Sequence, residues 1–170
     1  MAADFLLWDM RFPPESNARR QRSSTPHPFY TFNDQPITSP KLGCIQLTSF
    51  DFPWEIVIEA SNSAAGVTLG DLFEALYVEM DQPLLQTELI GASPPHIQQI
   101  SEACRVRESM IYPANFTFGS LKRIDWLMGN TAFCGLVENV SEFVPGTMLF
   151  LCGLSEVEAL RRRGGMGMMH

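Results

Sequence analysis

The sequence predicts an α+β domain in which two main helices pack on one face of an antiparallel or mixed sheet of about four to five strands. Segments of strand length lie at both ends of residues 42–158, and two segments with helical periodicity lie between them. Strands and helices do not alternate, which argues against a doubly wound fold. The 170 residues are 45% hydrophobic and 18% charged, enough to bury a core.

Residues 1–41 are predicted to form an extended, proline-rich arm that precedes the domain over 42–158. Prolines are spread through this segment, and we expect them to exclude regular helix there. Its middle, 15–25, is polar and expected to be mobile. Apolar patches at 5–12 and 29–32 are expected to pack on the domain or on a neighbouring subunit.

The first strands of the domain are predicted over 42–50 and 54–60. The second alternates clearly, with Trp54, Ile56 and Ile58 on one face. A turn containing Pro53 separates the two segments, which favours an antiparallel hairpin.

The clearest helix is predicted over 69–81, where apolar residues recur at spacings of three and four. Thr68 is a suitable N-cap, and Asp71, three positions later, suits a capping box. Pro83 is expected to end the helix.

A second helix is predicted over 95–107, with Ser93 as its cap and proline in its first turn. Its apolar face includes Ile100 and Cys104, whereas Arg105 and Arg107 are expected to be exposed.

The C-terminal part is predicted to return to strands. Residues 121–127 fit a strand or a short helix, and we favour the strand. Residues 133–139 and 147–153 are two further strands. A short helix over 155–163 and a flexible tail over 159–170 complete the prediction.

The net charge of −7 is unevenly distributed. Residues 44–158 hold four basic and fifteen acidic groups, a net of −11, so nucleic-acid binding by the folded body is not expected. Arginine clusters at 19–22 and 161–163 are either solvated or contact phosphate, anionic lipid or the acidic body. The sequence shows no export signal and no stretch long enough to span a bilayer, which predicts a cytoplasmic or nuclear protein.

The cysteines at 44, 104, 134 and 152 all lie in apolar contexts. Their spacing does not form a metal-binding knuckle. We expect buried free thiols, in keeping with a reducing compartment, and the alternatives are a disulfide or a reactive thiol.

Several short motifs carry a resemblance to a known family. They lie at 37–40 (ITSP), 53–56 (PWEI), 67–72 (VTLGDL), 123–127 (RIDWL) and 133–136 (FCGL). On these motifs the chain resembles an uncharacterised, DUF6699-like domain family abundant in mushroom-forming fungi, over roughly residues 30–155. The resemblance implies a fungal, intracellular protein and supplies neither an activity nor catalytic residues.

The candidate binding residues are Arg123, Asp125, Trp126 and His96. The segment 121–126 combines cations, an acid and a tryptophan. Two interpretations are open: Arg123 and Asp125 form a structural ion pair, or the segment is a patch that faces a ligand. His96 is either an exposed helix-start residue or a general base supported by a distant carboxylate. We found no catalytic motif and no metal motif, and we expect no cofactor.

These observations favour a non-catalytic protein-interaction or binding module whose partner is either another protein or a second copy of the chain, for instance in a homodimer. The aromatic arm and the acidic body with basic ends motivate this hypothesis. The alternative is a small enzyme or small-molecule-binding domain, with a non-local site that places His96 or Arg123 beside a carboxylate or Cys104. The sequence does not specify a ligand or a partner.

Overall fold

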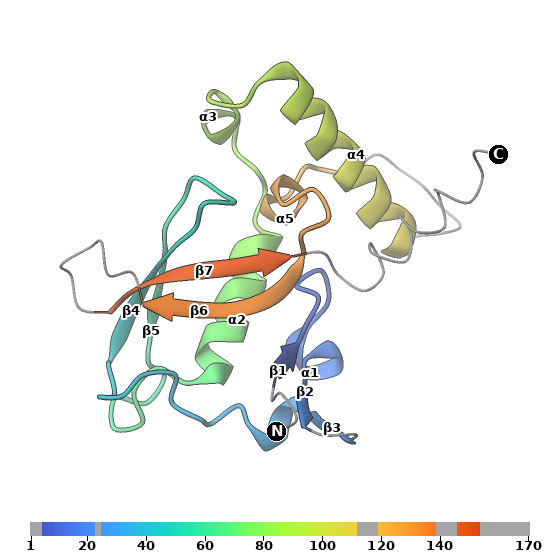
Figure 1. Cartoon of the computed structure of the whole chain (residues 1–170). Coiled ribbons are helices and arrows are strands. Elements are labelled where there is room, and N and C mark those ends of the chain that lie inside the picture. Colours follow the sequence, from blue (N-terminus) through green and yellow to red (C-terminus); the bar gives the residue numbers. More distant parts are fainter. Residues whose placement is uncertain (1–4, 23–24, 112–118, 139–145, 154–170) are drawn as a thin grey trace.

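The computed structural model describes residues 5–22, 25–111, 119–138 and 146–153, which form two sheets and their flanking helices (Figure 1). The central sheet has the order β5-β4-β7-β6, with β4 at Cys44–Thr48, β5 at Ile56–Glu59, β6 at Ala132–Glu138 and β7 at Thr147–Gly153. The N-terminal sheet consists of β1 (Phe5–Leu7), β2 (Arg19–Arg22) and β3 (Thr25–Pro28). The helical elements are α1 (Pro14–Asn17), η1 (Phe29–Thr31), α2 (Leu69–Asp81), α3 (Gln86–Leu89), α4 (Pro94–Ile111) and α5 (Arg123–Trp126).

The architecture confirms the predicted α+β class and the mixed sheet. The predicted hairpin is present, with β4 antiparallel to β5 and Ile45 opposite Ile58. The last two predicted strands also pair antiparallel to each other. The sheet is mixed because β4 pairs with β7 in parallel. Within the described ranges, no helix combines the length and the apolar character needed to cross a membrane.

Helix α2 has the predicted bounds and supplies one side of the core. Its residues Leu72, Phe73 and Leu76 have no exposed surface. In Figure 1 the helix lies behind β6 and β7, so it covers one face of the sheet. The inward side chains of the sheet, among them Ile58 and Phe150, belong to the same buried cluster. Burial of this apolar stripe is what holds helix and sheet together.

The capping box of α2 is also present as predicted. Thr68 Oγ1 accepts a hydrogen bond from the Asp71 backbone N–H at 3.2 Å, and Asp71 Oδ2 accepts one from the Thr68 N–H at 2.9 Å. Partial burial acts to raise the pKa of Asp71, but hydrogen bonds from Ser61 and Thr68 outweigh burial and bring the pKa below 3.8. The carboxylate therefore stabilises the fold at neutral pH, and this stabilisation is lost as the pH falls through the lowered pKa.

We expect Thr68→Ala to lower the free energy of unfolding by about 1 kcal/mol, because one backbone N–H at the helix start loses its acceptor. Urea denaturation at neutral pH measures this loss. Thr87→Ala, at an exposed threonine of α3, is the matched control and should stay within about 0.5 kcal/mol of wild type. An equal effect of the two substitutions would contradict a stabilising role for the cap.

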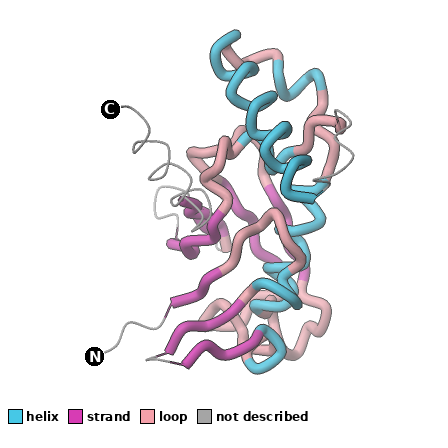
Figure 2. Tube along the Cα trace, turned by 90° about the vertical axis from the view of Figure 1, so that its right-hand side faces the viewer, coloured by secondary structure: helices cyan, strands magenta, loops and turns pink. Residues whose placement is uncertain are grey.

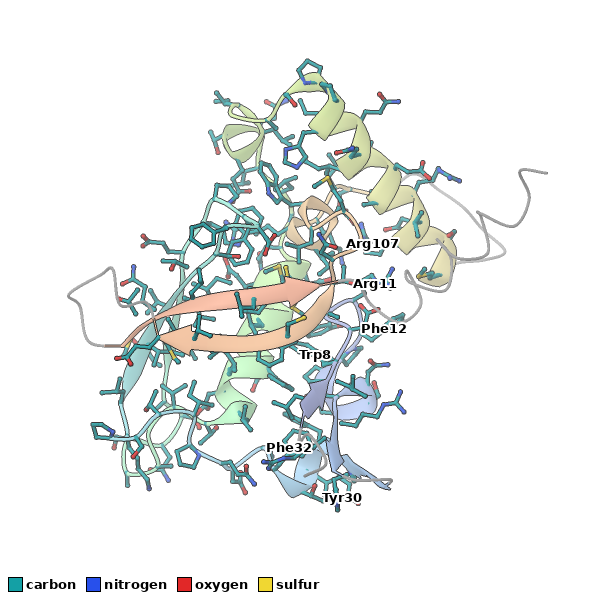
Figure 3. The ribbon with its side chains drawn as sticks, in the orientation of Figure 1. Trp8, Arg11, Phe12, Tyr30, Phe32 and Arg107 are labelled. Atoms are coloured by element: carbon teal, nitrogen blue, oxygen red, sulfur yellow. The ribbon has the colours of Figure 1, made fainter. Side chains whose placement is uncertain are left out.

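The N-terminal segment packs on the domain, as its apolar patches predict. Trp8 stacks on Phe73 with ring centroids 4.6 Å apart, and Phe29 stacks on the same ring at 5.6 Å. Figure 3 labels Trp8 and Phe32, both buried, and Tyr30, which is exposed. Hydrogen bonds from Phe133 N to Trp8 O and from Met10 N to Thr131 O, at 2.9 and 2.8 Å, join this segment to the start of β6. The segment therefore shares the core of the domain.

The prediction that residues 1–41 contain no regular helix was wrong. Helix α1 begins at Pro14. Backbone N–H groups in the first turn of a helix make no hydrogen bond within the helix, so a proline, which lacks this N–H, is tolerated there. The polar segment that follows forms β2, which pairs with both β1 and β3. In the view turned by 90° in Figure 2, these N-terminal strands lie at the opposite end of the molecule from α3.

The favoured strand over 121–127 was also wrong, because Arg123–Trp126 is helix α5. Asp125 Oδ2 accepts a hydrogen bond from the Lys122 backbone N–H at 2.8 Å, an interaction typical of a helix start. Helix α4 is longer than predicted and includes residues 108–111. The predicted terminal helix over 155–163 and the tail over 159–170 lie outside the described residues.

The four cysteines are free, but only part of the expectation for them holds. Cys104 is buried as predicted, whereas Cys44 and Cys134 are exposed. Cys44 begins β4, and Cys134 lies at an irregularity of β6 between Phe133 and Gly135. Apolar neighbours in sequence therefore did not indicate burial there, because residues at a strand start or a bulge leave the regular alternation.

Candidate functional site

The four predicted binding residues do not form one site. Arg123 donates from Nε and Nη2 to Glu88 Oε1 at 2.9 and 2.6 Å, and it also pairs with Glu79. Its guanidinium lies 4.9 Å from the ring centre of Trp54. The expected Arg123–Asp125 pair is absent from the described contacts, because residues two apart on a helix point in different directions. Arg123 instead joins α5 to α2 and α3.

Trp126 and His96 meet in an aromatic cluster that also includes Trp54, the ring on which Arg123 lies. Their ring centroids are 4.7 Å apart, and the Trp54 ring is 5.9 Å from that of Trp126. His96 is half-buried, so the expectation of an exposed helix-start residue was wrong. Its Nε2 and the Trp54 Nε1 have no hydrogen-bond partner among the described residues. The cluster packs the start of α4 against α5 and the β4–β5 hairpin.

Asp125 lies in a buried charge cluster centred on Arg107. Arg107 donates from Nε to Asp125 Oδ1 at 2.8 Å and from Nη2 to Oδ2 at 3.0 Å. Nη1 donates to Glu108 Oε1 at 2.6 Å. The prediction that Arg107 is exposed was wrong, since it is only 4% exposed. Its bidentate partner lies eighteen residues away, so no local pattern indicates the pair.

The same cluster determines the ionisation of its neighbours. Burial acts to lower the pKa of Arg107, but the hydrogen bonds and the charge of Asp125 overcome this effect and raise the pKa. Burial and then the charge of Asp125 raise the pKa of Cys104 to about 11. Cys104 is therefore a neutral thiol at pH 7, which does not suit a nucleophile.

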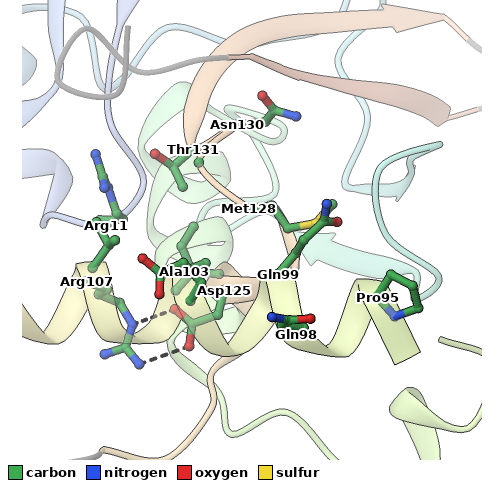
Figure 4. Close-up of a pocket in the computed structure, with 14 residues that line it drawn as sticks. Arg11, Pro95, Gln98, Gln99, Ala103, Arg107, Asp125, Met128, Asn130 and Thr131 are labelled. Atoms are coloured by element: carbon green, nitrogen blue, oxygen red, sulfur yellow. Dashed lines mark hydrogen bonds and ion pairs between the residues drawn. The ribbon is translucent and has the colours of Figure 1, made fainter. Parts of the chain in front are cut away.

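A cleft of about 600 Å³ opens beside this cluster, between α4 and the turn after α5 (Figure 4). Gln98, Gln99 and Arg107 come from α4, and Asn130 and Thr131 come from the opposite wall. The Thr131 hydroxyl is buried and has no hydrogen-bond partner in the part of the chain that the structure describes.

Sequence reasoning did not identify this cleft. Its lining residues come from three distant parts of the chain, around residues 11, 95–107 and 124–131. Of the predicted site residues, Asp125 lines it, and Arg123, Trp126 and His96 do not belong to its described lining. The charged segment 121–126, which contains Asp125, was the only part of the predicted site that pointed toward this cleft.

The outer face of the central sheet is a second candidate surface. Figure 1 shows this face toward the viewer, with no described helix over it. Val57, Val137 and Leu151 point to this side and are 61%, 44% and 36% exposed. The half-buried Leu149 lies opposite Val137 in the register. Apolar side chains from β5, β6 and β7 thus share one surface.

Comparison with known proteins places this architecture in a family. A family model described as a family of unknown function (DUF6699) matches residues 6–144. The chain belongs to this family. The match includes the N-terminal segment, which the resemblance over roughly residues 30–155 had left out. No curated protein and no solved structure matches the chain. Because DUF6699 carries no described activity, function has to be argued from the surfaces of this fold.

Proposed function

We propose that this chain is a non-catalytic protein-interaction module that binds a partner through the outer face of its central sheet. The observation that carries the proposal is the exposure of Val57, Val137 and Leu151 on the face that α2 leaves uncovered. Single exposed apolar residues are common, but several on one face of one sheet are typical of an interaction surface. The cytoplasmic or nuclear location and the fungal origin expected above are part of this proposal.

The charges around this face indicate the chemistry of the partner. The four strands of the sheet contain neither lysine nor arginine. Glu55 and Glu59 are exposed and alternate onto the same side as Val57. A partner segment that alternates apolar and basic residues complements this surface. A second copy of the same face would bring like charges together, which disfavours a face-to-face homodimer.

Synthetic peptides test the proposal. We expect the full chain to bind a peptide of alternating valine and lysine, and to bind the matching valine–glutamate peptide at least about tenfold more weakly. Val137→Lys combined with Leu151→Lys should weaken binding of the lysine peptide by about tenfold or more, because apolar contact is lost and like charge is added. Fluorescence anisotropy measures both effects.

Val78→Lys is the matched control, since Val78 is 51% exposed on α2, away from the sheet face. The proposal fails if the two peptides bind equally, or if Val78→Lys weakens binding as much as the sheet substitutions. Light scattering adds a separate readout. A wild-type dimer that the sheet substitutions dissociate would show that this face joins two copies of the chain instead.

A further inference from the structure

The cleft beside α4 contains a buried hydroxyl group with unused hydrogen-bonding capacity. Thr131 is 3% exposed, and its Oγ1 has no partner among the described residues. Its backbone carbonyl accepts a hydrogen bond from Met10 N at 2.8 Å, which holds the residue in place. Buried polar groups are nearly always hydrogen-bonded, so an exception that lines a cleft indicates a ligand or ordered water.

Three side-chain amides line the same cleft. Gln98, Gln99 and Asn130 contribute them, and their side chains form no hydrogen bond in the described structure. Each amide offers two donor hydrogens and one acceptor oxygen, so the cleft presents neutral donors and acceptors together. The cleft volume of about 600 Å³ lies within the usual range for small-molecule sites.

The charged groups of the cleft already have partners. Arg11 pairs with Asp9 at 2.6 Å, and Glu102 pairs with Arg105 at 2.6 Å. Arg107 and Asp125 form the buried bidentate pair described above. A charged ligand would have to compete with the buried Arg11–Asp9 and Arg107–Asp125 pairs, whereas a neutral ligand can use the amides and the hydroxyl.

The backbone at this wall is held in an unusual conformation. Met128 has a φ of 48°, in the left-handed region that non-glycine residues rarely occupy, and Gly129 follows with a φ of 97°. This turn leads directly into Asn130 and Thr131. Strained residues of this kind cluster at ligand sites, where the strain orients a functional group.

We propose that this cleft binds a neutral, polyhydroxylated small molecule, such as a sugar alcohol or a monosaccharide. Each ligand hydroxyl both donates and accepts, which matches amide side chains and the Thr131 hydroxyl. Apolar lining residues, including Ile124 and Met128, suit the C–H surfaces of such a ligand. This site is separate from the sheet face and does not depend on the protein-interaction proposal.

Titration of the full chain with mannitol, myo-inositol and glucose tests this assignment, with gluconate and glucosamine as charged counterparts. We expect at least one neutral polyol to bind with a dissociation constant on the order of 1 mM, and the charged compounds to bind at least about tenfold more weakly. Calorimetry or NMR chemical-shift changes report the binding.

Thr131→Val removes the hydroxyl and retains the shape of the side chain. It should weaken polyol binding by about tenfold and raise the melting temperature, because an unpartnered buried hydroxyl is replaced by a methyl group. Gln86→Ala, at an exposed glutamine of α3 outside the cleft, should change neither property. Binding of the valine–lysine peptide should be unaffected by Thr131→Val, so the two proposals can fail separately.

The assignment is overturned if no neutral polyol of this panel binds, if the charged compounds bind more tightly, or if Thr131→Val binds polyols as wild type does. A lower melting temperature for Thr131→Val would also count against it, since the hydroxyl would then have a stabilising partner of its own.

Discussion

Replacing Arg107 with methionine is expected to lower the free energy of unfolding by about 3–5 kcal/mol, because the substitution leaves buried carboxylates without their partner. Asp125 loses two hydrogen bonds, of 2.8 and 3.0 Å, and Glu108 loses one of 2.6 Å. Asp125 is 2% exposed, so water cannot readily replace the guanidinium. Urea denaturation followed by circular dichroism measures the loss.

Arg105→Met is the matched control on the same helix. Arg105 pairs with Glu102, but its side chain is 52% exposed, so the pair is expected to contribute less than about 1 kcal/mol. Replacing both Arg107 and Asp125 with apolar residues should recover part of the loss, since one of the unpaired charges is then removed. Equal effects of Arg107→Met and Arg105→Met would contradict the burial of this pair.

Trp8→Ala is expected to lower the free energy of unfolding by about 3–5 kcal/mol, because it removes a large buried aromatic side chain from the core. The indole ring stacks on Phe73 at 4.6 Å, and its N–H donates to the Phe12 carbonyl at 2.9 Å. Trp8 is 3% exposed, and Phe73 also contacts Phe29 and Phe133. The loss of one ring therefore leaves a cavity between the N-terminal segment and α2.

Tyr30→Ala provides the control within the same segment. Tyr30 is 76% exposed, so its removal should change the free energy of unfolding by less than about 0.5 kcal/mol. Denaturation curves of the two variants, recorded under identical conditions, make the comparison. If Trp8→Ala is no more destabilising than Tyr30→Ala, the N-terminal segment does not share the core in solution.

The candidate sites show that local sequence patterns can pick out interacting residues but not their partners. The segment 121–126 was singled out for its mixture of cations, an acid and a tryptophan, but the partners of these side chains were not predicted. Arg123 binds Glu88 and Glu79, and Asp125 binds Arg107, all from other helices. The strand prediction also placed Arg123 and Asp125 on one face, where a helix separates them. Without the partner helices, the two residues look like a local pair.

The sequence by itself determined the elements whose signals are local. The bounds of α2 follow from its apolar period and from the Thr68–Asp71 capping box. The faces of β5 follow from strict alternation, with Ile56 and Ile58 buried and Val57 exposed. Such patterns record which side of an element avoids water, because hydrophobic burial acts on each residue in its own position.

Only the tertiary structure decided which distant residues meet. The parallel pairing of β4 with β7, the burial of Arg107 against Asp125 and the cleft beside Thr131 each join parts of the chain that are far apart. The sequence around a charged residue can be the same whether its side chain is solvated or paired inside the protein. Its burial depends on a partner that packing brings to it, and that partner is not encoded in the neighbouring residues.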